Sequence, residues 1–284
     1  DLESMCQLLA RQQAAFTTVS SDNGLQLRAI ASAPFTTGLG NAPPTENGFA
    51  FLSPYGLPYL PGSGVKGVLR QAARELLSGE WGESLGWDSD TINALFGYEC
   101  DNDNAEHQRG ALSFWDVIPQ ISGESLAVEI MTPHQKHYYQ ESRTPHDSGQ
   151  PVPISFLTVP PGSEFVFHVL CDQRLLQHTA PHLLNNWQSL LQAAFTHAFD
   201  WLGFGAKTAV GYGAMRDKQQ LERARQQRQQ EKLQEAGIVV GSSVWSGALV
   251  KSVNPGAGEI QIEHADGRLA TGKLYSQLSD AAKK

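Results

Sequence analysis

The order of hydrophobic and polar positions predicts helices and strands that alternate along the first three quarters of the chain. Residues 9–16 suit a short helix, and residues 25–33 alternate apolar and polar side chains as a half-buried strand does. Apolar residues at helical spacing predict a helix over 64–78, with Ser63 as its N-cap and Gly79 as its stop. A second short helix is predicted over the segment TINALFG.

More strands and one long helix are predicted downstream. Residues 111–119 and 125–131 are expected to be adjacent strands, and strands follow at 152–160 and 163–171. Residues 180–203 predict a strong amphipathic helix, and a short strand is expected after the glycine-rich loop that follows it. Strand, helix, strands, helix and strand is the order of a ferredoxin-like βαββαβ unit. The predicted fold class is therefore α+β, with a long insertion.

The last quarter of the chain has a different pattern. Residues 216–236 lack an apolar stripe, which indicates a solvated charged helix that serves as a tether. Three short strands separated by NPGAG and DGR turns then predict a small all-β, barrel-like domain. The predicted domains are residues 1–215, the tether 216–236 and the small domain 237–284.

Charge and composition narrow the function classes. The formal net charge is −8, distributed as −11 over residues 1–215, +2 over 216–236 and +1 over 237–284. This balance argues against a bulk polyanion binder, although it leaves room for a narrow basic groove. The acidic residues of 80–106 indicate a solvated surface or, alternatively, a docking face for a basic partner. Three dispersed cysteines fit a reducing cytoplasm, and no apolar run suggests a membrane partner.

Two glycine-rich segments carry cations. In the segment PGSGVKGVLR, Lys66 and Arg70 share one face of the predicted helix. An open helix N-terminus attracts anions, and these two cations would extend such a site by one turn along the helix. In the segment GFGAKTAVGYG, four glycines and Lys207 suit a phosphate cradle of backbone N–H groups. The spacing of neither a P-loop nor a dinucleotide fingerprint is present. The alternatives are a capped helix with solvated cations and a glycine-rich turn that joins a helix to a strand.

The polar loop 132–151 holds the remaining candidate chemistry. His134 and His137 form an H-x-x-H pair without a third ligand nearby, so neither a metal nor a cofactor is predicted. Stacking of Tyr138 or a histidine on a nucleobase is more plausible, and a general base for RNA cleavage stays open. Asp116 ends a predicted strand, where a structural capping role is more common than catalysis.

Taken together, these motifs are similar to those of one known family. TTGLGNAPPTENGFAF, GLPYLPGSGVKGVLR, GALSFWDVIP, IMTPHQKHYY, PVPISFLTVPPGSEFVFHV and WLGFGAKTAVGYG occur in this order over about residues 25–215. They resemble the RAMP proteins of type III-B CRISPR–Cas (Cmr) effector complexes, and among these the family of the sixth subunit. The resemblance implies an RRM-like RAMP fold with long insertions.

The resemblance also implies a role in antiviral defence. It implies a non-catalytic RNA-binding subunit that holds the 3′ part of the guide RNA and the target RNA. Its partners would be the guide RNA, the target RNA and other Cmr subunits, especially the repeating backbone subunit. The residues expected to contact RNA are Ser63, Lys66, Arg70, His134, His137, Tyr138, Gly203, Gly205, Lys207, Thr208, Gly211, Tyr212 and Gly213.

Two other function classes stay open on the sequence. One is a RAMP endoribonuclease that processes guide precursors with His134 or His137 as its acid or base. The other is a nucleotide- or phosphometabolite-binding protein that uses residues 203–213.

The family pattern ends soon after the glycine-rich loop, so the segment 238–284 is predicted separately. It is expected to bind single-stranded RNA or, alternatively, to dock a protein. Its candidate RNA contacts are Trp245, Lys251, Arg268, Lys273 and Tyr275.

Overall fold

The protein is described here by a computed structural model that divides into two compact units, Asp1–Gln220 and Leu221–Lys284. The described residues are 2–41, 48–80, 85–98, 107–132, 144, 153–235, 249–254, 257, 259–264, 267 and 269–272.

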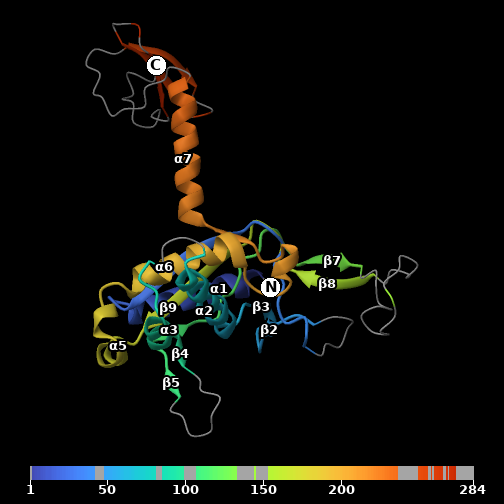
Figure 1. Cartoon of the computed structure of the whole chain (residues 1–284). Coiled ribbons are helices and arrows are strands. Elements are labelled where there is room, and N and C mark those ends of the chain that lie inside the picture. The colour runs from blue at the N-terminus through green and yellow to red at the C-terminus, as the bar shows by residue number, and fades with distance from the viewer. Residues whose placement is uncertain are drawn as a thin grey trace. The chain divides into compact units, whose positions relative to one another are not determined.

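The first unit is built on a four-stranded antiparallel sheet (Figure 1). Its strands lie in the order β10 (Met215–Asp217), β1 (Gly24–Ala31), β9 (Glu164–Cys171) and β6 (Leu112–Phe114). Along the chain, helices separate β1 from β6 and β9 from β10. The central pair is in register with Leu27 opposite Phe167, which places the apolar positions of both strands on one face.

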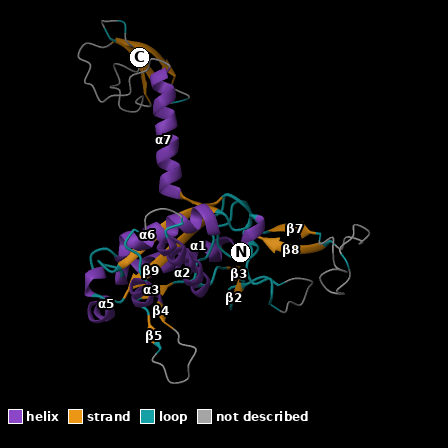
Figure 2. Cartoon of the chain, in the orientation of Figure 1, coloured by secondary structure: helices purple, strands orange, loops and turns teal. Residues whose placement is uncertain are grey.

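Two helices cover this apolar face, α2 (Gly62–Ser78) and α6 (Trp187–His197), and they pack against each other (Figure 2). The rings of Phe195 and Phe204 lie 5.2 and 5.0 Å from Phe167 of β9, centroid to centroid. Helix α2 ends at Gly79, whose φ of 72° is the left-handed conformation that a glycine stop supplies. The predicted helix stop is therefore confirmed.

Helix α1 (Leu2–Val19), which is longer than the predicted segment, packs on the opposite face of the sheet. Phe16 lies 4.6 Å from the ring of His168 and 5.5 Å from that of Trp115. His168 follows core-facing Phe167 on β9, so strand alternation turns it towards α1. The side chain of Gln12 adds a hydrogen bond from Nε2 to the carbonyl of Asp116, at 2.7 Å.

Smaller elements extend from this framework. A hairpin of β7 (Ala127–Met131) and β8 (Ile154–Thr158) projects away from the main sheet in Figure 1. The others are β2 (Phe51–Leu52), β3 (Leu57–Pro58), α3 (Ser89–Phe96), β4 (Gly97–Tyr98), β5 (Gln108–Arg109), α5 (Gln173–Thr179), η1 (Pro181–Leu183), η2 (Ala198–Leu202) and η3 (Thr208–Val210).

Two predictions about these elements are wrong. The strands predicted at 111–119 and 125–131 are not neighbours, because β6 pairs with β9 while β7 pairs with β8. Local alternation cannot identify a pairing partner that lies far along the chain. The helix predicted over 180–203 is also divided. Pro181 begins η1, α6 starts only after Asn186, and η2 completes the segment as a π-helical turn.

The second unit contains most of α7 (Lys218–Glu235) and a three-stranded antiparallel sheet. The strands are β11 (Leu249–Asn254), β12 (Glu259–Glu263) and β13 (Leu269–Gly272), with a register shift between Val250 and Ser252. Ile260 is its buried hydrophobic residue among those described. Closure into a barrel is a prediction that these three strands do not test, and the predicted domain boundaries stay predictions.

Some of the predicted residues of the small domain can be placed. Lys251 pairs with Glu263 at 2.9 Å. Trp245, Arg268, Lys273 and Tyr275 lie outside the described residues.

Across both units, none of the helices in the described part of the chain combines the length and the apolar character needed to cross a bilayer.

Candidate nucleic-acid interface

The glycine-rich loop, residues 203–213, is held by hydrogen bonds to the protein's own backbone. The N–H of Phe204 donates to the carbonyl of Gly213 at 2.9 Å, and the N–H of Gly213 donates to Pro34 at 2.8 Å. The N–H of Ala206 donates to Thr36 at 2.8 Å. These bonds close the loop on itself and attach it to the chain that follows β1.

Close backbone approach explains two of the loop glycines. A Cβ on Gly213 would lie 1.8 Å from the carbonyl oxygen of Phe204, and one on Gly205 would lie 2.4 Å from that of Thr36. Both glycines also have positive φ, as do Gly203 and Gly211. Only at Gly211 does the added Cβ meet open space.

The predicted N–H cradle therefore needs correction. The backbone N–H groups of 203, 204, 206 and 210–213 all donate to carbonyls of the protein. The glycines of this loop are explained by a chain that passes close to itself, and those N–H groups are not free for a phosphate. This bonding does not include the N–H groups of 205 and 207–209, which stay in the predicted cradle together with the charge of Lys207.

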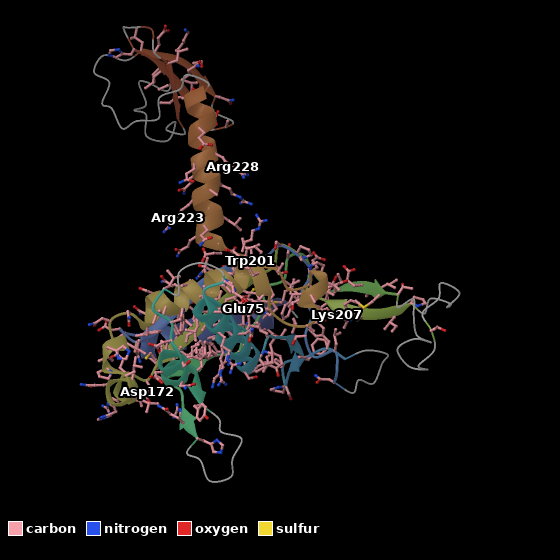
Figure 3. The ribbon with its side chains drawn as sticks, in the orientation of Figure 1. Glu75, Asp172, Trp201, Lys207, Arg223 and Arg228 are labelled. Atoms are coloured by element: carbon pink, nitrogen blue, oxygen red, sulfur yellow. The ribbon has the colours of Figure 1, made fainter. Side chains whose placement is uncertain are left out.

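Lys207 is held against the β7–β8 hairpin, as Figure 3 shows near the base of the hairpin. Its backbone is left-handed, with φ 60° and ψ 30°, which is unusual for a residue with a side chain. Its Nζ lies 3.0 Å from Sδ of Met131 and 5.7 Å from the ring centroid of Phe156. The cation thus sits over an aromatic face and is partly shielded from water. Thr208 begins the η3 turn directly after it.

Tyr212 contacts the same hairpin from the other end of η3. Its ring lies 5.6 Å from that of Phe156. Burial raises the pKa of Tyr212, and the charge of Glu129 on β7 raises it further. The phenol therefore stays protonated at neutral pH and can donate a hydrogen bond. We call Glu129, Met131, Phe156, Lys207 and Tyr212 the loop–hairpin cluster.

The start of α2 differs from the prediction. Ser63 is not the N-cap; Pro61 occupies that position and makes no side-chain cap. Instead, the N–H of Gly62 donates to Oδ1 of Asp116 at 2.7 Å. The first N–H of the helix is therefore occupied by a carboxylate of the protein itself, so the helix start is not the fully open anion site that was predicted. A Cβ on Gly62 would lie 2.2 Å from the carbonyl of Phe114, so this approach requires glycine.

The two cations of α2 lie beyond this capped start. Lys66 and Arg70 are both partly exposed, and Nε of Arg70 is buried with no hydrogen-bond partner among the described residues. The described contacts do not join either side chain to Lys207. The structure therefore presents two cationic positions, one on α2 and one in the loop–hairpin cluster.

The other predicted site residues are not placed. His134, His137 and Tyr138 lie outside the described residues. Within the part of the chain that is described, no group of three or more His, Cys, Asp or Glu side chains could hold a metal ion.

Of the acidic residues in 80–106, Asp88 caps α3 by accepting the N–H of Thr91 at 2.6 Å. That hydrogen bond lowers the pKa of Asp88.

Two histidines that were not among the predicted site residues are buried in the structure. Burial, together with the charge of Arg28, lowers the pKa of His168 to about 4, so this ring is neutral at pH 7. His197 on α6 lies 2.7 Å from Glu75 on α2, nitrogen to oxygen, and links the two helices. Neither position carries a sequence signal beyond its place in an apolar stripe.

The fold and this loop together define a class of protein: an α+β unit in which a glycine-rich turn precedes an edge strand of an antiparallel sheet. Within that class, the chain belongs to the RAMP superfamily, whose family model matches residues 31–216. The chain is 29% identical over 226 residues to a curated protein of Pyrococcus furiosus, the CRISPR system Cmr subunit Cmr6. That similarity covers 63% of this chain and 63% of the relative, so it spans less than two thirds of the relative's length.

Of two solved structures that match this chain, the first shows a related fold. A chain in the cryo-EM structure of the type III-B Cmr-beta complex bound to cognate target RNA matches with a TM-score of 0.51 and 18% identity. The match covers 75% of this chain and 65% of that one. The crystal structure of Cmr6 from Pyrococcus furiosus matches with a TM-score of 0.37 and 24% identity, over 68% of this chain and 97% of that chain.

Proposed function

We propose that this protein is a non-catalytic RNA-binding subunit of a type III-B CRISPR RNA-guided effector complex. It would help to hold the 3′ part of the guide RNA and the target RNA beside the repeating backbone subunit. The observation that carries this proposal is the 226-residue similarity to a Cmr subunit in a chain whose residues 31–216 match the RAMP family.

The topology supports the proposal at the level of the fold. With β1, β6, β9 and β10 counted as strands one to four, the sheet order is four, one, three, two, and all neighbours are antiparallel. Helix α2 joins the first two strands and α6 joins the last two. This order supports a ferredoxin-like unit, an arrangement that RRM-type RNA-binding domains also use.

The cations support an RNA backbone as the ligand. Lys66 and Arg70 keep part of their surface in water on α2, and Lys207 is oriented by the loop–hairpin cluster. Phosphate contacts of this kind position a nucleic acid without reading its sequence. A subunit that holds guides of any sequence requires contacts of this type.

Two described histidines bear on the non-catalytic part of the proposal. His168 is buried beneath α1, and His197 is buried against Glu75, so neither is accessible to a phosphodiester. The acid–base candidates of the endoribonuclease alternative are His134 and His137, which lie outside the described residues. Incubation of the protein with a repeat-containing RNA in the absence of metal tests that alternative, which requires cleavage that His134→Ala or His137→Ala abolishes.

The test of the binding role is guide-RNA affinity as a function of salt concentration. For Lys66→Gln/Arg70→Gln/Lys207→Gln, we expect the salt slope to fall by about 0.7 for each phosphate that the protein no longer neutralises. Arg109→Gln/Arg174→Gln removes charge from exposed positions on β5 and α5 and should leave the slope nearly unchanged. An identical slope and affinity in the triple variant and the wild type would refute the assigned contacts.

A further inference from the structure

Helix α7 is an exposed helix with an excess of positive charge in an acidic chain. Its 18 residues, Lys218–Glu235, hold five Lys or Arg and three Asp or Glu, whereas the whole chain has a net charge of −8. Residues 222–229 are all exposed, and no apolar stripe runs along the helix. Packing therefore does not explain the choice of its surface residues.

The cations of α7 are not distributed as in a simple spacer helix. At 3.6 residues per turn, Lys218, Arg225, Arg228 and Lys232 fall within an arc of about 80°, whereas Arg223 lies about 140–160° away from Arg225 and Arg228. Arg225 and Arg228 are three apart, and Lys232 follows four positions later. Like charges at these spacings repel by about 0.2–0.5 kcal/mol per pair. A spacer would gain stability by alternating acids and bases there.

The helix has acids beside this face: Glu222 lies three positions before Arg225, and Glu231 lies three positions after Arg228. Among the described residues, Arg223, Arg225 and Arg228 make no ion pair; the pairs that include Lys218 and Lys251 are with Glu164 and Glu263. The side chains of Arg223 and Arg228 extend away from the helix in Figure 3. The seven glutamines of the helix add side chains that can hydrogen-bond to phosphate and sugar oxygens.

We propose that the face of α7 defined by Arg225, Arg228 and the position of Lys232 binds the phosphodiester backbone of RNA, separately from the cations of α2 and the loop–hairpin cluster. Arginine presents a planar fork that matches phosphate oxygens, and a polyanion removes the repulsion between neighbouring cations. The contacts are sequence-independent because they reach phosphates. The proposal rests on the proposed function for its choice of RNA as the polyanion.

The helical arrangement provides a matched pair of variants for the test. Arg228→Gln and Arg223→Gln make the same charge change on opposite faces of one helix, and glutamine has a helix propensity close to that of arginine. The assay is the affinity of the full chain for an unrelated, labelled single-stranded RNA at several salt concentrations. We expect Arg228→Gln to weaken binding about three- to fivefold and to reduce the salt slope by about 0.7. Arg223→Gln should change the affinity less than twofold.

Two further variants extend the comparison. Arg225→Gln/Arg228→Gln should reduce the affinity by about tenfold or more, since two phosphates are then left without a cation. Glu222→Gln/Glu231→Gln, which leaves the helix more basic, should strengthen binding. Circular dichroism of each variant verifies that the helix content is unchanged.

The outcomes separate this proposal from the proposed function. Equal effects of Arg223→Gln and Arg228→Gln, or no effect of either, would overturn the α7 surface. Unchanged RNA affinity together with abolished binding to a polyglutamate peptide would assign the face to an acidic protein and also overturn the proposal. Guide-RNA binding by Lys66→Gln/Arg70→Gln/Lys207→Gln is measured in parallel. Its result tests the proposed function whether or not α7 binds RNA.

Discussion

The start of α2 and the glycine-rich loop have the same sequence signature, glycines beside cations, but the structure uses them differently. At α2, a carboxylate from the segment after β6, Asp116, takes the helix N–H that an outside anion would otherwise use. In the loop, the chain's own carbonyls take seven of the eleven N–H groups, while Lys207 is turned onto the hairpin. Glycine in both places serves a close approach within the protein. The cations, rather than a complete cradle of backbone amides, remain available for a ligand.

The largest effect is expected from Gly213→Ala. A Cβ there would lie 1.8 Å from the carbonyl oxygen of Phe204 at a φ of 69°, so the backbone has to shift. We expect a loss of at least about 3 kcal/mol of stability in urea denaturation. Gly211→Ala is the control, because it also has a positive φ but meets open space, and should cost only about 1 kcal/mol. Equal losses in the two variants would mean that φ alone, and not close approach, explains the glycines.

Asp116→Ala tests the role of the carboxylate at the start of α2. Removing the carboxylate frees the N–H of Gly62 and should cost about 1–2 kcal/mol of stability. The same change removes a negative charge near the start of α2, so affinity for RNA should rise if Lys66 and Arg70 lie on the RNA path. Asp116→Asn keeps an oxygen acceptor and should lose less stability while it gives a similar gain in affinity. A fall in RNA affinity with either variant would contradict the proposed position of the guide.

Lys207 allows charge and backbone strain to be separated. Lys207→Gly relieves a left-handed residue and should stabilise the protein by up to about 1 kcal/mol, whereas Lys207→Gln keeps the strain. Both remove the cation and should reduce the salt slope of guide-RNA binding by the same amount, about 0.7. Thermal unfolding and the salt titration, made on the same two proteins, report the two effects independently. Different salt slopes for the two variants would show that the conformation contributes to binding.

The smallest effect is expected at the pair that joins α2 to α6. Burial raises the pKa of Glu75, but hydrogen bonds from Gln71 and His197 outweigh it, and the pKa is lowered overall. A carboxylate with a lowered pKa contributes stability that is present above its unfolded-state pKa and is lost as the pH falls through the folded-state value. The stability of Glu75→Gln should therefore depend less on pH between about 5 and 3 than that of the wild type. Urea midpoints measured across that range test this, with Glu80→Gln at an exposed position as the control.

Sequence patterns predicted the parts of this fold that depend on neighbouring residues. The strands that contain Leu27 and Phe167, the apolar stripe of α2 and the stop at Gly79 were all visible, since their signals lie within one element. The pairing of β7 with β8 was not visible. A structural capping role was predicted for Asp116, and the structure confirms it, but its partner Gly62 was not predicted. Asp116 lies 54 residues from Gly62, and no local rule connects two such positions. For the candidate site, the cations could be predicted, but the bonding of the loop N–H groups could not.

The position of α1 has a consequence for how bases can be read. In RRM-type domains, exposed aromatic side chains on the open face of the sheet stack on two or three bases and give sequence preference. Here Phe16 and His168 are 4% and 3% exposed, and with Trp115 they form an aromatic group that α1 helps to enclose. The face of the sheet on which bases stack in RRM-type domains is therefore covered here by the protein's own aromatic side chains. Under the proposed function, an RNA would therefore contact loops, helix faces and edges of this unit, where its sugar–phosphate backbone can be held whatever its base sequence.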